Sequence, residues 1–537
     1  MTTFAAALAA ERPDQVALDD GKSRLGWADI DGILNRAANA LLGRGLGDGG
    51  RVAVFAENSA ETALAHVGGL IAGASTVPCN FHLSAAELAY ILSDSEARVL
   101  FVGPETAERG LEAARQAGVA TVVAWGLQPG DLEAGAAALT APGSQAGPRG
   151  NPLEGPVVVD WATWLETADP ADPPPDLAPR PHLLYTSGTT GRPKGTDLPP
   201  TMFAGGATVA EHLERLKENR FAAFGTHLVV GPMYHTGPLS GARLLAAGIP
   251  SVILGRFDAE ATLRAIEEHR VETSVMVPTH FIRLLALPEE LRRRYDVSSL
   301  RLVTHTGARC PVEVKRAMIE WWGPVIFEAY GATEVGTTNS ITSEEWLAHP
   351  GSVGRAIPPF TAMILDDAGN EVPAGVEGRL FFKDSTGRGI IYHNDPGKTA
   401  AANVAPGVFS LGEIGYMDAD GYVYITDRFS DMVVSGGVNI YPAESEQVLI
   451  GHPKIADVAC IGVPNAEMGE ELKALVVPAD PADPPSEKEV IEYCRERLSH
   501  YKCPRTVDFV DSIGRTTMAK VNKRELRAKY WKDAAQA

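Results

Sequence analysis

The chain has 537 residues, more than a single hydrophobic core organises, so we expect at least two domains. Its formal net charge of −20 argues against nucleic acid and anionic membrane surfaces as partners, because both are themselves negative. The five cysteines form no Cys-x-x-Cys pair, which favours reduced thiols in a cytoplasmic protein and offers no thiolate metal site.

The N-terminal region lacks the pattern of a targeting segment. Residues 1–12 hold a short alanine-rich run with no basic region before it, which makes a poor signal peptide. The most apolar stretch, residues 62–77, contains His66 and several glycines, so we predict a core helix running into a strand. We therefore expect a cytoplasmic protein with no membrane span.

Residues 51–102 alternate the signals of strands and helices. A β-rich run opens the segment, Ser59 starts a helical pattern, and residues 98–102 return to strand. Ser84 followed three residues later by Glu87 predicts a capping box at the start of another helix. This rhythm is typical of a mostly parallel sheet covered by helices.

Residues 127–180 have a different composition, dominated by Ala, Gly and Pro. They end in the run Pro170-Ala-Asp-Pro-Pro-Pro175. Such a composition predicts a loose surface excursion, which here leads into the next apolar run.

The stretch from Leu184 to Gly195 has the composition of a phosphate-holding loop. Three glycines are interleaved with four hydroxyl residues and one lysine: Thr186, Ser187, Gly188, Thr189, Thr190, Gly191, Lys194 and Gly195. Glycines let the backbone N–H groups approach phosphate oxygens, the hydroxyls add donors and the lysine adds a charge. The spacing is not the Walker pattern, and Pro193 precedes the lysine. A flexible surface turn is the alternative, but such turns seldom combine so many donors with a lysine.

Further strand and helix signals follow the loop. We predict a helix over 208–219, a helix beginning at Asp258, and strands over 226–230, 271–277, 300–304 and 325–328. The last two strands run into polar, glycine-containing sequence at 306–308 and 330–334. Because the carboxyl ends of parallel strands share one edge of a sheet, we expect a ligand site along that edge.

The C-terminal third changes character twice. Residues 351–426 are rich in short strands and turns, which predicts an antiparallel subdomain. From about Asp431 the pattern is that of a small α+β domain, with a capping box formed by Ser486 and Glu489.

Taken together and in order, these motifs resemble the adenylate-forming superfamily, which includes acyl-CoA synthetases, carrier-loading adenylation domains and beetle luciferases. The segments whose motifs match those of this family are 186–195, 306–308, 330–334, 427–431 and 434–442. The resemblance implies an α/β fold: a large N-terminal domain of mostly parallel sheets covered by helices, with an antiparallel β subdomain, and a small mobile α+β domain. We expect the large domain to span residues 1–429 and the small one residues 430–537.

The resemblance also implies roles in nucleotide binding. The motif at 330–334 would place Tyr330 on adenine with Gly331 beside it, Thr333 at the α-phosphate, and Glu334 on Mg²⁺, a hard cation that takes carboxylate and phosphate oxygens. A surface carboxylate is the alternative for Glu334. The further nucleotide positions are Gly307 and Ala308 on the adenine side, and Glu413 and Arg428 on the ribose. Glu413 stands where the family usually has Asp, one methylene shorter.

Three more segments would handle the acyl group, CoA and the hinge. His235 matches the position that borders the acyl pocket, with a packed core histidine as the alternative. Ser430 matches the pivot between the domains. Gly436 and Gly437 would let the pantetheine arm of CoA pass close to the backbone.

The main departure from the family lies near the C-terminus, where the family has Pro-x-x-x-x-Gly-Lys. Lys520 is present, but Gly514 replaces the proline and Ala519 replaces the glycine. If position 519 needs positive φ, alanine costs about 1–2 kcal/mol or moves the loop, and a glycine at 514 loosens it. A catalytic charge misplaced by about 1 Å can cost on the order of a hundredfold. The alternative is that the two replacements are neutral sequence drift and that Lys520 still functions. If the altered loop does impair adenylation, we expect the double variant Gly514→Pro/Ala519→Gly to raise it.

The resemblance thus implies an acyl-CoA ligase that uses ATP, Mg²⁺ and CoA. From the departure at Gly514 and Ala519 we hypothesise that thioester formation is intact and that adenylation is weak or lost. Such an enzyme could receive its acyl-adenylate from a separate adenylating enzyme. A complete two-step ligase, a stand-alone adenylation protein that loads a carrier, and a binding-only relic are the alternatives. The small residues Gly237, Gly307 and Gly336 suggest room for a bulky carboxylic acid, and a homodimer is our mild expectation.

Overall fold

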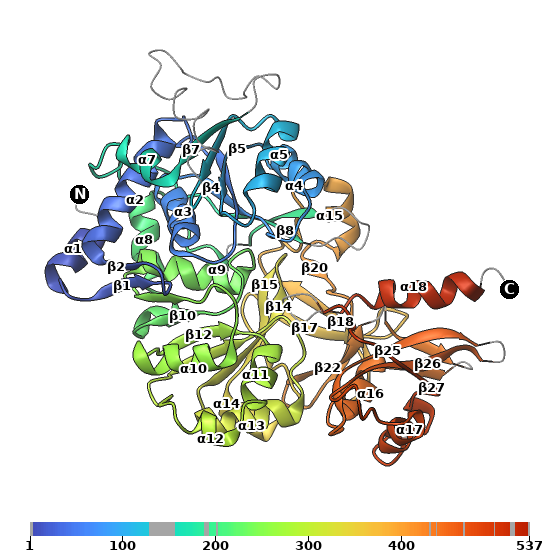
Figure 1. Cartoon of the computed structure of the whole chain (residues 1–537). Coiled ribbons are helices and arrows are strands. Elements are labelled where there is room, and N and C mark those ends of the chain that lie inside the picture. The colour runs from blue at the N-terminus through green and yellow to red at the C-terminus, as the bar shows by residue number, and fades with distance from the viewer. Residues whose placement is uncertain are drawn as a thin grey trace.

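The computed structural model describes residues 4–127, 156–186, 193–199, 202–428, 431–435, 438–465, 468–498, 500–515 and 521–534. Its helices and strands form an α/β protein, from α1 (Phe4–Glu11) at the N-terminus to α18 (Lys523–Ala534) at the C-terminus (Figure 1). Two sheets built mainly of parallel strands come first, an antiparallel sheet follows, and a small α+β unit ends the chain. The expected fold class is therefore confirmed.

The first sheet confirms the strand and helix rhythm predicted for residues 51–102. Its strands are β4 (Ser75–Pro78), β3 (Arg51–Phe55), β5 (Ala97–Val102), β6 (Thr121–Ala124) and β7 (Val157–Asp160), in that spatial order and all parallel. The helices between them are α3 (Ala60–Ile71), α4 (Ala85–Asp94) and α5 (Ala107–Ala117). The capping box of α4 forms as predicted, since Ser84 Oγ accepts from the Glu87 N–H and Glu87 Oε2 accepts from the Ser84 N–H at 2.8 Å.

The prediction of a loose excursion over 127–180 is wrong for part of that segment. Residues 157–160 form β7, and α7 (Trp161–Glu166) follows it directly, capped by Asp160. Trp164 is fully buried, with its ring 5.4 Å from that of Phe101. The three valines and the aspartate at 157–160 carry a short strand-and-cap signal that the surrounding Ala, Gly and Pro concealed. Residues 128–155 lie outside the described part.

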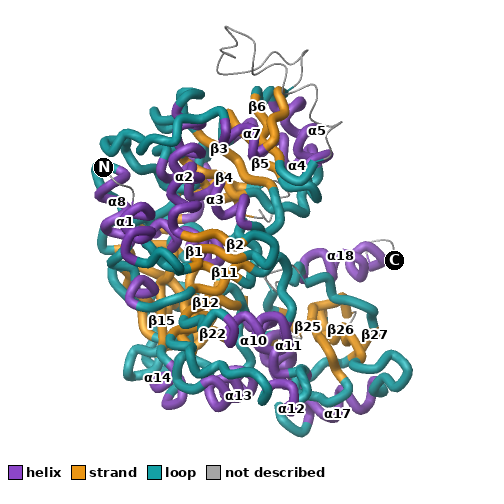
Figure 2. Tube along the Cα trace, turned by 60° about the vertical axis from the view of Figure 1, so that its left-hand side comes forward, coloured by secondary structure: helices purple, strands orange, loops and turns teal. Residues whose placement is uncertain are grey.

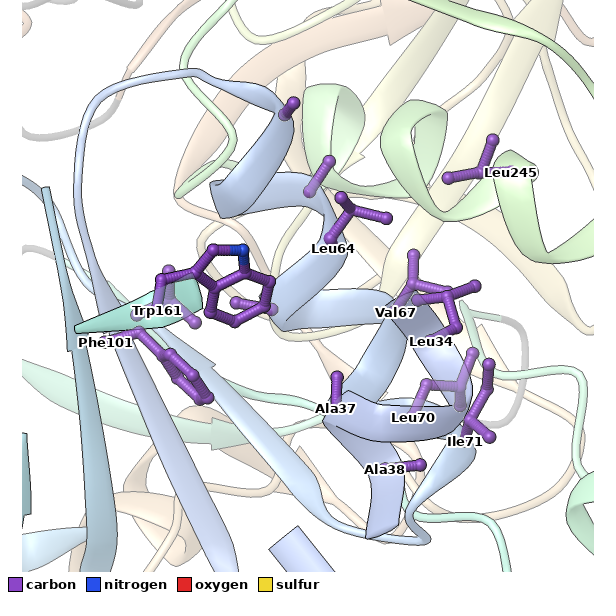
Figure 3. Packing of buried hydrophobic residues seen from close by; sticks show 14 of the residues in the cluster. Leu34, Ala37, Ala38, Leu64, Val67, Leu70, Ile71, Phe101, Trp161 and Leu245 are labelled. Atoms are coloured by element: carbon purple, nitrogen blue, oxygen red, sulfur yellow. The ribbon is translucent and has the colours of Figure 1, made fainter. Parts of the chain in front are cut away.

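The core of this region is packed between helices and the first sheet. Figure 3 shows side chains of α2 (Trp27–Leu42) and α3 facing one another, with Phe101 and Trp161 beside them. The two helices approach closely because α3 has a glycine at the contact: a Cβ on Gly68 would lie 2.9 Å from the Cβ of Ala37. Leu245 extends the same cluster toward the second sheet, so the two sheets share a core.

The second sheet has nine strands. In spatial order they are β16 (Arg355–Ala356), β15 (Gly336–Ile341), β14 (Ile326–Ala332), β13 (Leu302–His305), β12 (Thr273–Met276), β10 (His227–Val229), β11 (Ser251–Ile253), β1 (Val16–Asp19) and β2 (Arg24–Gly26). The six from β14 to β1 are parallel, and β15, β16 and β2 add antiparallel edges.

Helices cover both faces of this sheet. One face packs against α10 (Ala259–Glu268), α11 (Pro278–Leu285) and α13 (Val312–Trp322), and the short α12 (Glu289–Arg292) lies between α11 and β13 in the chain. The other face meets α8 (Val209–Leu216), η2 (Arg220–Ala223), α9 (Thr236–Arg243) and η3 (Leu244–Ala247). The helix predicted over 208–219 is shorter than expected, because it ends at Leu216. The helix beginning after Asp258 is confirmed, with Leu263 and Ile266 fully buried.

The antiparallel subdomain predicted for residues 351–426 is confirmed. Its strands are β17 (Phe360–Leu365), β18 (Gly378–Asp384), β19 (Asn403–Ala405), β20 (Val408–Phe409), β21 (Glu413–Met417) and β22 (Val423–Arg428). Every strand pair in this sheet is antiparallel. Two short helices complete the region, α14 (Ser343–Ala348) before the sheet and α15 (Pro396–Ala402) within it.

The C-terminal α+β unit is confirmed as well, and Figure 2 shows its sheet beside the rest of the protein. Its strands are β23 (Val433–Ser435), β24 (Val438–Ile440), β25 (Ile455–Asn465), β26 (Gly469–Pro478) and β27 (Thr506–Phe509). Its helices are α16 (Pro442–Leu449), α17 (Glu487–Arg495), the short η4 (His500–Lys502) and α18. Ser486 and Glu489 form the predicted capping box of α17. Among the described residues, no helix is long and apolar enough to cross a bilayer.

Buried histidines make the fold sensitive to mild acid. Burial lowers the pKa of His66, His227 and His280 to about 3 and that of His212 to about 4. In the unfolded chain these groups take up protons below pH 6.5, so the unfolded state gains stability as the pH falls from 6.5 toward those values. At pH 5.5 each of these four buried histidines costs about 1.4 kcal/mol, or about 6 kcal/mol together.

We therefore expect Tm to fall steeply between pH 6.5 and 5, where most carboxylates remain ionised, and to stay level between pH 7 and 8. Thermal unfolding in matched buffers measures this. The variant His212→Gln should lose about a quarter of the pH dependence that these four histidines contribute. A Tm that does not change between pH 6.5 and 5 would contradict the prediction.

Candidate functional site

The phosphate-loop candidate is the connection of a two-stranded hairpin. The strands β8 (Leu183–Thr186) and β9 (Lys194–Asp197) pair antiparallel, with Thr186 opposite Lys194. The strand predicted before the loop is thus confirmed. The loop leaves and re-enters at one end of the hairpin, unlike a strand-to-helix phosphate loop. Five candidates lie outside the described residues: Ser187, Gly188, Thr189, Thr190 and Gly191.

The hairpin is held between α4 of the first-sheet region and the segment 391–393 that precedes α15. On the β8 side, the Tyr185 hydroxyl donates to Asp94 Oδ2 of α4 at 2.6 Å. On the β9 side, the His393 N–H donates to the Gly195 carbonyl at 2.9 Å, and the Asp197 N–H donates to the Ile391 carbonyl. This contact is close, since a Cβ on Gly195 would lie 3.0 Å from His393 Cβ. Figure 1 shows β8 between the first sheet and α15.

Lys194 and Glu334 meet around one tyrosine. The Lys194 Nζ lies 5.3 Å from the ring centroid of Tyr392, within the range of a cation–π contact. Burial raises the pKa of Tyr392 to about 12, and the charge of Glu334 adds to the effect, which places that carboxylate near the same phenol. The lysine and the acid of two motifs about 140 residues apart therefore both lie near one half-buried aromatic ring.

Glu334 and Thr333 lie in a sharp corner between β14 and β15. We predicted that the strand would end at residue 328, but β14 continues through Tyr330 and Gly331 to Ala332, because β15 pairs with it. The ladder has an irregularity after Tyr330, and at this point the two backbones touch: a Cβ on Gly331 would lie 1.9 Å from the Gly336 carbonyl oxygen. Only glycine fits there.

The turn after β13 lies beside this corner. Gly307 has φ +87°, which favours glycine, and Ala308 follows it. The Thr306 N–H donates to the Met276 carbonyl of β12, which ties the turn to the neighbouring strand. Since His305 at the end of β13 pairs in register with Glu328 of β14, the turn at 306–308 and the stretch at 330–334 share the carboxyl edge of the sheet. The expected clustering of the two motifs is thus observed.

The two ribose candidates lie on paired strands. Glu413 opens β21 and is directly opposite Arg428, the last residue of β22. Residues directly opposite in an antiparallel pair point to the same face, with their Cβ atoms about 4.5–5.5 Å apart. Glu413 is buried, whereas the side chain of Arg428 lies outside the described part. The strand register therefore accounts for the pairing of these two positions.

His235 caps the N-terminus of α9 and is half-buried, with its ring 4.3 Å from that of Tyr234. The glycines that suggested room for a bulky acid serve close packing and turns instead. A Cβ on Gly237 would lie 2.8 Å from Val275 Cγ1, so this glycine lets α9 pack against β12. Gly307 and Gly336 both have positive φ and serve their turns. These three positions therefore give no information about the size of the pocket.

The remaining candidates lie at the C-terminal unit and largely outside the described residues. Ser430, Gly436, Gly437, Ala519 and Lys520 are not described, although β23 and β24 on either side of the two glycines pair as a hairpin. Gly514 has φ +63°, and its N–H donates to Ser512 Oγ at 3.1 Å. A proline has neither that φ nor an N–H, so the idea that proline would fit better at 514 is wrong for this backbone.

Described residues on both sides of the 516–520 segment are anchored. The Arg515 guanidinium binds both carboxylate oxygens of Asp457 on β25, each at 2.7 Å. Lys523 Nζ lies 2.8 Å from Glu446 Oε1 of α16. The segment that contains Lys520 therefore starts and ends at fixed points of the C-terminal unit.

Sequence reasoning missed Tyr392 and a group of buried ionisable residues, Lys315, Glu328 and His305. Tyr392 carries no motif and meets Lys194 only through tertiary packing. A signal existed for Glu328, because a charged residue within a predicted strand of a helix-covered sheet calls for a partner.

Comparison with known proteins agrees with this arrangement. Residues 5–388 match the family described as AMP-binding enzyme, and residues 444–520 match the AMP-binding enzyme C-terminal domain. The indoleacetate–CoA ligase of Aromatoleum aromaticum is 30% identical over 521 residues, covering 96% of this chain and 95% of the relative. A feruloyl-CoA synthase of an Amycolatopsis species is 32% identical over 529 residues, covering 96% of each.

Solved structures share the fold. ATP-bound MatB from Rhodopseudomonas palustris superposes with a TM-score of 0.75 at 28% identity, covering 98% of this chain and 99% of that one. The anthranilate CoA ligase AuaEII in complex with anthranoyl-AMP gives a TM-score of 0.77 at 24% identity, covering 99% and 97%. The match extends over nearly the whole length of each protein.

Proposed function

The chain belongs to the AMP-binding enzyme family, in its acyl-CoA synthetase branch, and from this premise we propose that it joins a bulky carboxylic acid to CoA through an acyl-adenylate. Its reaction class is that of an AMP-forming acid–thiol ligase. The observation that carries the proposal is the approach of Lys194 and Glu334 to the same half-buried ring, Tyr392. The relatives named for indoleacetate and ferulate support a bulky or aromatic acid.

In the first half-reaction a carboxylate oxygen of the acid attacks the α-phosphorus of ATP, and the bond to pyrophosphate breaks. Lys194 and the loop of the β8–β9 hairpin would hold the phosphates, and Thr333 would contact the α-phosphate. Lys520 would stabilise the negative charge that develops in the transition state. Glu334 suits Mg²⁺, which proteins bind through one or two carboxylates together with substrate phosphates, and the ion would neutralise phosphate charge.

The rest of the nucleotide would lie along the carboxyl edge of the second sheet. Tyr330 would stack on adenine, with Gly307 and Ala308 on its other side. The direct register pairing of positions 413 and 428 supports their assignment to the ribose hydroxyls. His235, at the start of α9, would border the acyl group.

In the second half-reaction the CoA thiol attacks the acyl carbon and AMP leaves. We propose that residues 430–537 turn as a unit about Ser430 relative to residues 1–429, which would withdraw Lys520 and bring up Gly436 and Gly437. The two half-reactions would then use different residues of the C-terminal unit.

This division makes the alanine at 519 informative. Because Gly514 is explained by its own turn, Ala519 alone bears on the loop of Lys520. We propose that Ala519 weakens the first half-reaction and leaves the second intact, so that the protein would profit from an acyl-adenylate made by a separate enzyme.

Two parallel assays test the function. One supplies indoleacetate, ferulate or a long-chain fatty acid with ATP, Mg²⁺ and CoA, and the other supplies the synthetic acyl-adenylate with CoA. Thioester in the second assay alone supports the half-reaction proposal, and Ala519→Gly should then restore the first. Thioester at similar rates in both means a complete ligase. No thioester in either, but transfer to a free carrier protein, would overturn the assignment of CoA as acceptor.

The anchor at Arg515 offers a separate prediction. Arg515→Ala removes both hydrogen bonds from the guanidinium to the Asp457 carboxylate. It should lower the rate of adenylation about tenfold, because the residue that precedes the segment of Lys520 is no longer anchored. Thioester formation from the acyl-adenylate should change less than about twofold, since Lys520 takes no part in it. Pyrophosphate exchange and thioester release measure the two steps. Lys488→Ala, which removes a surface ion pair with Glu492, is the matched control. An equal loss in both steps would contradict the prediction.

A further inference from the structure

Three ionisable side chains lie buried together behind the carboxyl edge of the second sheet. Lys315 Nζ lies 2.5 Å from Glu328 Oε2, and His305 Nε2 lies 3.4 Å from the same oxygen. The side chains of Lys315 and His305 are fully buried, and that of Glu328 is 9% exposed. We call this group the buried triad.

The triad joins three elements. Lys315 lies on α13, Glu328 on β14 and His305 at the end of β13. His305 and Glu328 are register partners in the parallel sheet, so their side chains emerge on the same face, toward α13. The Lys315 ammonium also lies 4.9 Å from the ring centroid of Trp346, which covers it from α14.

The charge state of the triad follows from its surroundings. Burial raises the pKa of Glu328, but the Lys315 ammonium beside the carboxylate outweighs burial and keeps that pKa below its usual range, so Glu328 is ionised near neutral pH. Burial lowers the pKa of His305 more than Glu328 raises it, which leaves the imidazole neutral. The triad is therefore a Lys–Glu ion pair with a neutral histidine against the carboxylate.

Such a pair is a weak source of stability. Removing two charges from water costs several kcal/mol per ion, and well-packed apolar residues of similar volume often stabilise a fold as well or better. A buried ion pair does fix the distance between the two elements that carry its charges, because each charge is compensated only when it lies beside its partner. Its position is thus more informative than its energy.

That position is directly behind the candidate nucleotide site. His305 immediately precedes the turn of Gly307 and Ala308, and Glu328 is two residues before Tyr330. The two stretches expected to enclose adenine are therefore the continuations of the two strands that the triad ties together.

We propose, as an inference that rests on the proposed function, that Lys315, Glu328 and His305 are positioning residues, which set the separation between the 306–308 turn and Tyr330. That separation in turn sets the affinity for the adenine nucleotide. None of the three needs to touch the ligand.

Equilibrium binding of AMP to the full-length protein tests this without relying on turnover. Lys315→Met and Glu328→Gln each leave one buried group uncompensated, so both should lower Tm and weaken AMP binding about tenfold. The double variant Lys315→Met/Glu328→Leu replaces the pair by apolar side chains of similar volume. It should regain the wild-type Tm while its AMP affinity stays about tenfold weaker.

The controls separate positioning from general stability. Met318→Ala truncates a fully buried residue of α13, one turn from Lys315, and should lower Tm without changing AMP affinity. If AMP affinity returns with Tm in the double variant, the triad is merely structural and the inference is overturned. If the wild-type protein itself binds no AMP, the proposed function fails instead. Where a single variant does not fold, the milder His305→Asn takes its place with the same expected loss of affinity.

Discussion

Gly331→Ala is expected to reduce kcat/KM for ATP by at least about a hundredfold and to destabilise the protein by several kcal/mol. The new Cβ would lie 1.9 Å from the Gly336 carbonyl oxygen and 3.0 Å from Thr337 Cα. Both contacts are with backbone atoms, so no side chain can rotate away, and β14 and β15 must separate. The corner that presents Thr333 and Glu334 moves with them, and a displacement of about 1 Å at a catalytic group can cost on the order of a hundredfold.

Steady-state kinetics with varied ATP, together with thermal unfolding, measure both effects. Gly369→Ala is a suitable control, because Gly369 has positive φ, which tests the backbone cost of an alanine, but has nothing within 4 Å of the added Cβ. It should lose only about 1–2 kcal/mol of stability and keep its activity. An alanine variant at 331 with wild-type kinetics would mean that the corner is more adaptable than its geometry indicates.

Glu334→Gln is expected to slow adenylation by about a hundredfold to a thousandfold while thioester formation from a supplied acyl-adenylate falls by less than about tenfold. The amide keeps the size of the side chain but loses the charge that a hard cation prefers. Pyrophosphate is the leaving group of the first step only, so the metal that neutralises it matters mainly there.

The two half-reactions are measured separately, over a range of Mg²⁺ concentrations. High Mg²⁺ should recover part of the loss in Glu334→Gln, because the variant weakens metal binding rather than folding. Glu345→Gln, on α14 and outside the candidate site, serves as the control for loss of a carboxylate. A variant that loses both half-reactions equally would assign Glu334 to the structure of the corner instead.

The sequence predicted those parts of the fold that depend on local signals. The capping box at Ser84 and Glu87 is a contact between residues three apart, and the strand and helix rhythm of 51–102 follows from periodicity. The strand β7 escaped prediction because a short apolar run within Ala, Gly and Pro gives little local signal. The extension of β14 to Ala332 escaped it because pairing with β15 decides where that strand ends.

The candidate site was predictable to the extent that its residues sit in motifs at strand ends. The edge shared by 306–308 and 330–334 follows from parallel pairing, which the sequence pattern indicated. Tyr392 and the buried triad depend on contacts between segments far apart in the chain, which no local pattern encodes. Gly514 shows the reverse case, in which a departure from a motif has a conformational cause, a positive φ, that sequence alone could not supply.

The β8–β9 hairpin has no hydrophobic core of its own. A two-stranded hairpin is only marginally stable in water, so this one owes its order to its neighbours: Leu183 packs into the core of the first sheet, Tyr185 binds Asp94, and β9 binds residues 391–393. Local opening of such an element requires far less free energy than unfolding of the sheets around it. A nucleotide bound at the hairpin would supply part of the missing stability, so that occupancy of the site and slow amide hydrogen exchange along β8 and β9 become two measures of one equilibrium.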